Sequence, residues 1–306
     1  MKKYVLMVIG FFISLSLVGC ATVSHGEYTQ KWAKNKPEFL QLQDGLKLRY
    51  VRTGNGPPLV LLHTTRTQLD YFDKLVPLLS YKYQVIVIDL PGHGQSSIQD
   101  VAYSEKFFRQ VTSEFITKLD LKDVTLVGES IGGVLALTTS TEIPDRVTRI
   151  VSLNPYDYGE KFGGGIRRSN SGWMVGLFNI FGSYTLEPKF VTAAVMQGGF
   201  YDPKKLPDDL LTEFSQTGNR DGYRKAEYTV FRNWNSWLDA RALYGKVRAP
   251  VTLVYGSTDW SNAAEREQNQ KAIANAELVT IEKSGHFSAQ ESPDVVAKII
   301  LTGQAN

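Results

Sequence analysis

The sequence predicts an α/β protein built on a mostly parallel, doubly wound sheet. Short apolar runs alternate with helical patterns, and nearly all the runs are continuous Val, Ile and Leu. Continuous apolar runs are typical of strands that are buried on both faces of a parallel sheet. The interval 155–248 contains no comparable run, which indicates an insertion between two strands of this sheet.

The composition is that of an ordinary globular protein. Of the 306 residues, 42% are hydrophobic and 21% are charged, which excludes disordered, collagenous and coiled-coil classes. At roughly 100–200 residues per domain, the length fits one large domain or two modest ones. The 34 Lys and Arg against 31 Asp and Glu give a net charge of +3, with no long run of one sign. We therefore expect no nucleic-acid partner.

The first residues have the pattern of a targeting segment. Lys2 and Lys3 precede an apolar run from Val5 to Val18, which is somewhat short for a membrane-spanning helix. The run leads into Leu-Val-Gly-Cys-Ala, which contains Cys20, the only cysteine of the chain. This pattern resembles the lipobox of bacterial lipoproteins, in which cleavage before the cysteine exposes the residue that carries lipid. An uncleaved anchor, or an ordinary signal peptide with an incidental cysteine, is the alternative.

The lipobox resemblance implies a location for the protein. Residues 1–19 are the expected signal peptide, and Cys20 is the expected site of lipid attachment, with the bacterial membrane as partner. Ala21 resembles the sorting state of lipoproteins released to the outer membrane of Gram-negative bacteria. This favours the periplasmic face of the outer membrane over the inner membrane within the cell envelope. Residues 20–37 are polar without periodicity and are predicted to be a tether.

The globular part is predicted to begin at residue 38 with a hairpin, because the turn signal Asp44-Gly45 precedes the alternation at 46–50. Helical spacing follows at 69–79 and 108–119. The remaining strands are predicted at Leu59–Leu62, Gln84–Asp89, Val124–Gly128, Val147–Leu153, Val251–Tyr255 and Glu277–Glu282. The core therefore comprises residues 38–154 and 249–306. Residues 155–248 are too many for a loop and are predicted to form a helical cap.

The strand at Val124–Gly128 leads into a recognisable motif. Gly128-Glu129-Ser130-Ile131-Gly132-Gly133 is followed by a helix-forming run, which makes strand, G-x-S-x-G, helix. This arrangement is the nucleophile elbow, whose turn is so tight that Cβ groups at Gly128 and Gly132 would clash. It predicts that Ser130 is a nucleophile presented above the sheet. The alternative is a turn serine that only caps the helix.

A serine nucleophile needs a base and an acid that orients the base. His286 lies in the loop after the last predicted strand, and Asp259 directly follows the preceding one. Taken singly, His286 has the alternative of a solvated loop histidine, and Asp259 that of an Asx turn or a helix cap. Together with Ser130 they give the chain order Ser, Asp, His, each at a strand end, which predicts a catalytic triad.

With these residues the chain resembles the α/β-hydrolase superfamily over about residues 40 to 302. The segment Asp89–Ser96 is similar to the D-x-P-G-x-G-x-S loop of that family, and the helical insertion is a further match. The resemblance implies the α/β-hydrolase fold with an inserted helical cap. His93 is expected to shape its loop, with the role of catalytic base as the alternative.

The loop after Leu62 departs from the family, which usually carries His-Gly where this chain has His63-Thr64. By resemblance, the backbone N–H groups of Thr65 and Ile131 form the oxyanion hole. Thr64 lacks the freedom that glycine has at positive φ, so we expect a hole of altered shape, or one assisted by a threonine hydroxyl.

Other side chains are candidates for contact with the substrate. Arg66 has two interpretations: it binds a substrate carboxylate, or it pairs with a structural acid. The aromatic residues of the cap are expected to select a substrate by apolar fit without taking part in the chemistry. The expected substrate-binding residues are His63, Thr64, Arg66, Glu129, Trp173 and Phe181. No phosphate-cradling glycine motif or Cys/His metal spacing occurs in the sequence, so we expect neither cofactor nor metal.

These residues predict a serine hydrolase that cleaves carboxylic esters or related acyl compounds of apolar or amphipathic character through an acyl-enzyme. A C–C bond hydrolase and a cofactor-free perhydrolase use the same triad and remain alternatives. Haloalkane dehalogenases and epoxide hydrolases carry an aspartate at the elbow, which Ser130 argues against. A non-catalytic envelope protein that binds an apolar ligand in the capped pocket is the alternative from a different class.

Overall fold

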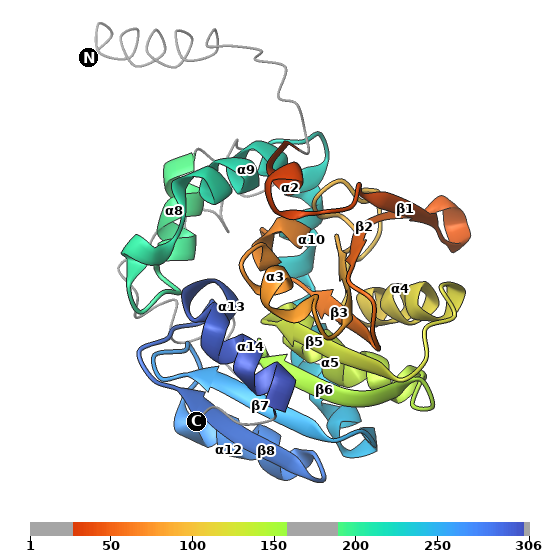
Figure 1. The fold of residues 1–306 in the computed structure, drawn as a ribbon, viewed down its shortest axis with the longest axis vertical. Coiled ribbons are helices and arrows are strands. Elements are labelled where there is room, and N and C mark those ends of the chain that lie inside the picture. The colour runs from red at the N-terminus through yellow and green to blue at the C-terminus, as the bar shows by residue number, and fades with distance from the viewer. Residues whose placement is uncertain (1–26, 158–188, 303–306) are drawn as a thin grey trace, which may run out of the picture.

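The fold is centred on a sheet of eight strands in the order β1-β2-β4-β3-β5-β6-β7-β8 (Figure 1). The computed structural model describes residues 27–157 and 189–302. β1 pairs antiparallel with β2, and β2 pairs antiparallel with β4, whereas the strands from β4 to β8 are parallel to one another. The strands are β1 (Glu38–Gln41), β2 (Lys47–Thr53), β3 (Pro58–Leu62), β4 (Gln84–Ile88), β5 (Val124–Glu129), β6 (Val147–Leu153), β7 (Val251–Gly256) and β8 (Ala276–Ile281).

The six strands predicted from apolar runs are confirmed, and their ends agree with the structure to within one residue. The predicted hairpin is formed by β1 and β2, with the short 3-10 helix η2 (Gln43–Gly45) in its turn. The central strands β3, β4 and β5 are almost wholly buried, as their continuous apolar runs indicated. The α/β prediction of a mostly parallel sheet is therefore correct.

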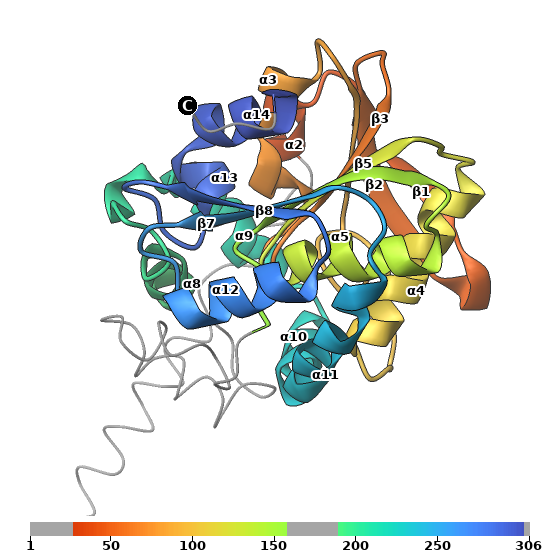
Figure 2. The same ribbon diagram turned by 90° about the horizontal axis from the view of Figure 1, so that it is seen from below.

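Helices cover both faces of the sheet, as Figure 2 shows. One face carries α3 (Leu75–Leu79) and α14 (Pro293–Thr302), and the other carries α4 (Glu105–Lys118), α5 (Ile131–Glu142) and α12 (Ala263–Ala272). The helical spacing predicted at 69–79 is divided into the 3-10 helix η3 (Leu69–Phe72) and α3. The break places Pro77 in the first turn of α3, where its missing N–H removes no helical hydrogen bond.

The segment predicted to be a tether up to residue 37 departs from that expectation. The helix α2 (Glu27–Trp32) packs on the body of the protein through aromatic side chains. Tyr28 is buried and its hydroxyl donates to Asp73, while Trp32 Nε1 donates to Asp70 Oδ1 at 2.7 Å. A purely polar tether has no such groups to bury, so these two aromatic residues account for the difference.

The described residues between β6 and β7 form helices and loops without a strand. They are α8 (Lys189–Gln197), η4 (Pro203–Lys205), α9 (Asp208–Gly218), α10 (Tyr223–Arg232), α11 (Trp234–Asp239) and η5 (Ala240–Lys246), here called the cap helices. The predicted substrate contacts Trp173 and Phe181 lie outside the described residues, as do the predicted signal peptide at 1–19 and Cys20. Among the residues that are described, none of the helices has the length and apolar character needed to span a membrane.

Candidate active site

The elbow at Ser130 lies between β5 and α5, as the sequence predicted. Ser130 has φ 61° and ψ −120°, a conformation that L residues rarely adopt. A Cβ at Gly128 would lie 2.0 Å from the carbonyl oxygen of Gly132, and a Cβ at Gly132 would lie 2.0 Å from that of Leu62. Both glycines are therefore required for the turn that holds the serine above the sheet.

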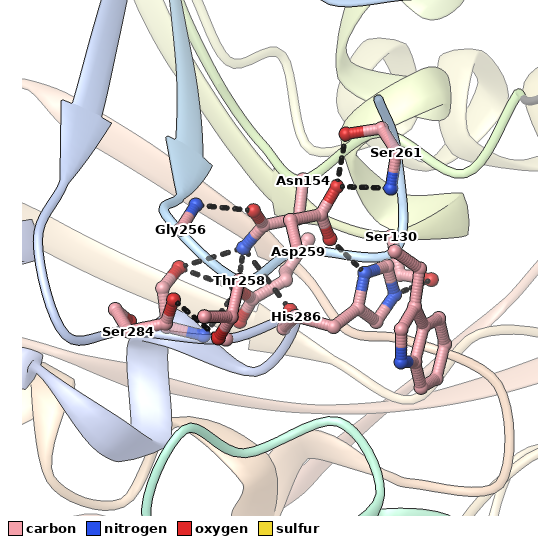
Figure 3. Close-up of polar contacts among 12 residues, drawn as sticks. Ser130, Asn154, Gly256, Thr258, Asp259, Ser261, Ser284 and His286 are labelled. Carbon is pink, nitrogen blue, oxygen red and sulfur yellow. Dashed lines mark hydrogen bonds and ion pairs between the residues drawn. The ribbon is translucent and has the colours of Figure 1, made fainter. Parts of the chain in front are cut away.

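The structure brings together the three residues of the predicted triad (Figure 3). Ser130 Oγ lies 3.0 Å from His286 Nε2, and His286 Nδ1 lies 2.5 Å from Asp259 Oδ1. All three side chains are buried. When Nδ1 donates to the carboxylate, Nε2 is left as the acceptor for the serine hydroxyl, which is the tautomer that a general base requires.

Asp259 is held as an anion by its neighbours. Its Oδ2 accepts hydrogen bonds from the backbone N–H of Ser261, at 3.0 Å, and from the Ser261 hydroxyl (Figure 3). Burial raises the pKa of the Asp259 carboxyl, but the charge and hydrogen bond of His286, with the hydrogen bonds of Ser261, outweigh it and lower the pKa to about 2. The carboxylate is thus ionised at neutral pH and able to orient the imidazole.

Asn154 joins the loops that carry the acid and the base (Figure 3). Its Oδ1 accepts from the backbone N–H of Gly256 at 2.8 Å, and its Nδ2 donates to the carbonyl oxygen of His286 at 3.0 Å. Asn154 itself has φ 43°, a conformation that Asn tolerates better than most residues. This residue was not identified from the sequence, although its place directly after β6 was an available signal.

Aromatic side chains surround the imidazole of His286. The ring of Trp260 stacks on His286 with centroids 3.9 Å apart and an interplanar angle of 16°. Phe287 and Tyr156 contact the same imidazole edge-on, at 5.1 and 5.8 Å. These contacts restrict the movement of the ring. Trp260 was not identified from the sequence, although it directly follows Asp259.

The loop that carries His286 is attached to the cap helices at residues 198–202, between α8 and η4. Gly199 supplies the carbonyl oxygen that accepts the His286 N–H at 2.6 Å. Glu291, in the short helix α13 (Ser288–Glu291), accepts from the backbone N–H groups of Gly285, Tyr201 and Asp202 at 2.6–3.0 Å. The position of the base therefore depends on a contact between core and cap that the sequence did not reveal.

The predicted oxyanion loop, residues 63–67, runs from the end of β3. Across residues 27–157 and 189–302, no acceptor takes a hydrogen bond from the N–H of Thr65 or from that of Ile131, as expected for groups reserved for a ligand. The expectation of a hole of altered shape rested on a backbone position at Thr64 that favours glycine, and Thr64 does not occupy such a position. The residue of this loop at positive φ is Arg66, with φ 61°. The Thr-for-Gly difference from the family thus causes no backbone strain at Thr64.

His63 does not fit its expected role in substrate binding. The side chain is fully buried and both ring nitrogens have backbone partners. Nε2 accepts from the Leu90 N–H at 2.9 Å, and Nδ1 lies 2.7 Å from the carbonyl oxygen of Thr64. Burial, reinforced by the nearby charge of His93, lowers the pKa of His63 to about 3. His63 is therefore a neutral residue that ties the oxyanion loop to β4.

Glu129 likewise does not fit substrate binding, because its carboxylate is occupied within the core. Oε1 accepts from the Ser288 N–H and from Asn154 Nδ2, and Oε2 accepts from the Tyr71 hydroxyl and the Ala289 N–H, at 2.5–3.1 Å. The side chain is fully buried, which raises its pKa. Glu129 fixes the start of α13 beside the elbow.

Arg66 and His93 both face α10 of the cap. The Arg66 guanidinium lies over the ring of Phe231, 5.5 Å from its centroid. His93 Nδ1 lies 3.0 Å from the carbonyl oxygen of Pro91, and Nε2 lies 2.6 Å from the carboxylate of Glu227. His286, not His93, occupies the position of the base at Ser130, so the geometry favours the loop-shaping role of His93. Nothing in the sequence pattern around Glu227 indicated this contact.

In the described ranges, no group of three or more His, Cys, Asp or Glu side chains is arranged to hold a metal ion. The polar groups around Ser130 are instead arranged for proton transfer between a hydroxyl, an imidazole and a carboxylate.

Comparison with known sequences and solved structures identifies the family of this chain. The α/β-hydrolase fold family matches residues 57–293. A haloalkane dehalogenase of Agrobacterium fabrum is 31% identical over 295 residues, covering 84% of this chain and 88% of its own. A pimeloyl-[acyl-carrier protein] methyl ester esterase of Neisseria meningitidis is 25% identical over 231 residues, with 74% and 85% coverage. The crystal structure of Cfl2 from Burkholderia cenocepacia superposes with a TM-score of 0.74 at 20% identity, covering 87% of this chain and 94% of that one. With Ser130, Asp259 and His286 assembled at the strand ends of this fold, the chain belongs to the α/β-hydrolase fold family and is a hydrolase.

Proposed function

We propose that this hydrolase cleaves carboxylic esters, or related acyl compounds, through a covalent acyl-enzyme on Ser130. The observation that carries the proposal is the continuous arrangement of Ser130 Oγ, the two nitrogens of His286 and Asp259 Oδ1, at 3.0 and 2.5 Å. The relatives include an esterase, which supports the reaction class but not a particular substrate.

The proposed reaction follows from the positions of these groups. Ser130 Oγ attacks the acyl carbon while its proton passes to His286 Nε2, and Asp259 stabilises the resulting imidazolium. Collapse of the tetrahedral intermediate expels the alcohol, which takes the proton from His286. Water then attacks the acyl-enzyme with the same histidine as base, so that the acid leaves and Ser130 regains its proton.

The N–H groups of Thr65 and Ile131 are the proposed oxyanion donors. Ile131 is the first residue of α5, so its N–H lies at the positive end of the helix dipole. Each donor aimed at the developing negative oxygen contributes about 2.7–4 kcal/mol to lowering the barrier. The lack of a protein acceptor for either group within the described ranges supports this role.

We propose an apolar or amphipathic substrate of small size. Thr64, Arg66, Trp173 and Phe181 remain the proposed contacts from the oxyanion loop and the cap. The buried aromatic residues around His286 support an apolar environment for the reacting group. C–C bond hydrolysis and cofactor-free perhydrolysis use the same triad and are the alternatives within the superfamily.

The experiment that tests the proposal uses a fluorophosphonate probe and a panel of p-nitrophenyl esters of increasing acyl length. The purified protein should be labelled and should hydrolyse at least one ester, and Ser130→Ala should remain folded while it loses both properties. A protein that is neither labelled nor active would favour the non-catalytic ligand-binding alternative. Retention by Ser130→Ala of more than about a tenth of the wild-type kcat would refute the triad assignment.

We further propose that Cys20 carries lipid and anchors the enzyme to the bacterial envelope, at the periplasmic face of the outer membrane. The support is the lipobox-like sequence that ends the apolar run Val5 to Val18. Several acyl chains bind a membrane far more firmly than a single chain, which gives only marginal binding. Metabolic labelling with a palmitate analogue should mark the wild type and leave Cys20→Ser unmarked; equal labelling of the two would refute the anchor.

A further inference from the structure

The carboxylate of Glu227 connects the cap to the oxyanion loop. Glu227 lies on α10 and is 1% exposed. Its Oε1 accepts a hydrogen bond from the backbone N–H of Arg66 at 3.0 Å and lies 2.6 Å from His93 Nε2. Because Arg66 directly follows Thr65, this contact is one residue away from a proposed oxyanion donor.

The Arg66 amide is held in a conformation that its own sequence does not favour. Its φ of 61° lies in the left-handed region, which is unfavourable for a non-glycine residue. A charged acceptor forms a stronger hydrogen bond with an amide than a neutral one does. Other anchors of this loop come from the core, where His63 accepts from Leu90, and from the loop itself, where the Thr67 hydroxyl donates to the carbonyl oxygen of Thr64. Among the described residues, Glu227 is the cap residue that accepts a hydrogen bond from a backbone N–H of this loop, and this bond opposes relaxation of the Arg66 backbone.

His93 keeps the Glu227 carboxylate charged and in place. Both side chains are buried, which disfavours either charge alone. Their mutual attraction outweighs this effect, so the pKa of Glu227 is lowered and that of His93 is raised. His93 is itself fixed through Nδ1 by the carbonyl oxygen of Pro91. The histidine of the 89–96 loop therefore orients a cap carboxylate toward the oxyanion loop.

We propose that Glu227 is a positioning residue for the oxyanion hole: through the Arg66 N–H it sets the direction of the Thr65 N–H. The inference rests on the proposed function, because it assigns a role in the same transition state. It also revises the expectation that the cap takes no part in the chemistry, since a residue of the cap would determine how well the oxyanion is stabilised.

The test compares Glu227→Ala, Glu227→Gln and Glu227→Asp with Glu213→Ala. Glu213 is the matched control, because it is another buried cap carboxylate that contacts the side chain of Gln68 and no backbone N–H of residues 63–67. Glu227→Ala should lower kcat about 10- to 100-fold on the best ester, with KM changed by less than about threefold. Glu227→Gln keeps an oxygen acceptor for the Arg66 N–H and should recover most of kcat. Glu227→Asp keeps a negative charge near His93 but moves the acceptor oxygen away from the Arg66 N–H. Its kcat should therefore lie between those of Glu227→Ala and Glu227→Gln.

Amide hydrogen exchange of the peptide that spans residues 63–68 gives a readout independent of activity. Exchange at the Arg66 amide should be at least about tenfold faster in Glu227→Ala and Glu227→Asp, and close to wild type in Glu227→Gln and Glu213→Ala. Unchanged exchange, a loss confined to KM, or an equal loss of kcat in Glu213→Ala would each overturn the inference. A wild type with neither turnover nor phosphonate labelling would instead refute the proposed function, and the exchange data would still decide whether Glu227 holds the loop.

Discussion

The elbow and the oxyanion loop each hold a non-glycine residue at the same positive φ by different means. Ser130 and Arg66 both have φ 61°. Ser130 is held by its immediate surroundings: its N–H donates to Leu153, its carbonyl accepts from Gly133, and the flanking glycines allow the turn to close. Arg66 is held by Glu227, which lies 161 residues away in the sequence. The φ of Ser130 thus depends on the elbow motif and on the neighbouring strand β6, whereas the φ of Arg66 depends on a contact from the cap.

The largest expected effect comes from a change that leaves both loops intact. Asp259→Asn should lower kcat about 10⁴-fold, because an amide next to His286 favours the wrong tautomer of the imidazole. Both loops should keep their hydrogen-exchange protection, since neither is bonded to Asp259. Kinetics on the best ester and exchange of residues 63–68 and 128–133 check the prediction. A loss of protection in residues 128–133 would show that the conformation of the elbow depends on Asp259, and a loss in residues 63–68 would show the same for the oxyanion loop.

Gly132→Ala tests the place where the elbow touches the oxyanion loop. The added Cβ would lie 2.0 Å from the carbonyl oxygen of Leu62 and 2.7 Å from that of His63, so the two loops must move apart. We expect kcat to fall by about 100-fold or more and the free energy of unfolding to drop by about 1–3 kcal/mol. Gly218→Ala is the control, because its Cβ would come no nearer than 3.3 Å to another group, the Nη2 of Arg224. If Gly132→Ala and Gly218→Ala lowered kcat by the same small factor, the close contact at Gly132 would not be needed to position the oxyanion loop.

Glu291 tests whether the histidine loop depends on the cap as the oxyanion loop does. Glu291→Ala removes the acceptor shared by the N–H groups of Gly285, Tyr201 and Asp202. His286 would then be less firmly placed, and we expect kcat to fall about tenfold with KM little changed. Glu291→Gln, which retains an acceptor oxygen, should restore most of the rate. A loss of thermal stability with normal kcat in the folded protein would mean that Glu291 only joins the cap to the core.

The smallest expected effect concerns stability alone. Burial raises the pKa of Asp157 to about 6, although Tyr244 and Asn269 donate hydrogen bonds to it. The folded state holds the proton of Asp157 more tightly than the unfolded state does. The contribution of Asp157 to the free energy of unfolding is therefore complete below about pH 4 and is lost as the pH rises through 6. Asp157→Asn cannot ionise, so its Tm relative to wild type should increase between pH 4 and pH 7. Parallel Tm curves across this range would contradict the assignment.

The sequence alone determined the features that depend on short-range rules. Apolar runs that suit a buried parallel sheet located its strands to within one residue, and G-x-S-x-G after a strand located the elbow. Ser130, Asp259 and His286 each follow a strand of this sheet. Because a parallel sheet brings the carboxyl ends of its strands to one edge, the sequence also predicted that these three side chains lie close together. These features need only neighbouring residues and the direction of the strands.

The tertiary structure decided which residues support the catalytic groups. Asn154, Trp260, Glu227 and Glu291 contact loops that are distant in sequence, and neither their type nor their spacing identifies a partner. The same limit explains why His63 and Glu129 were expected at the substrate and are instead occupied by buried backbone and side-chain groups. A carboxylate or imidazole that is buried must find a hydrogen-bonding partner wherever the fold supplies one. Which partner that is depends on how the cap packs against the core, and this contact is formed only by the folded chain.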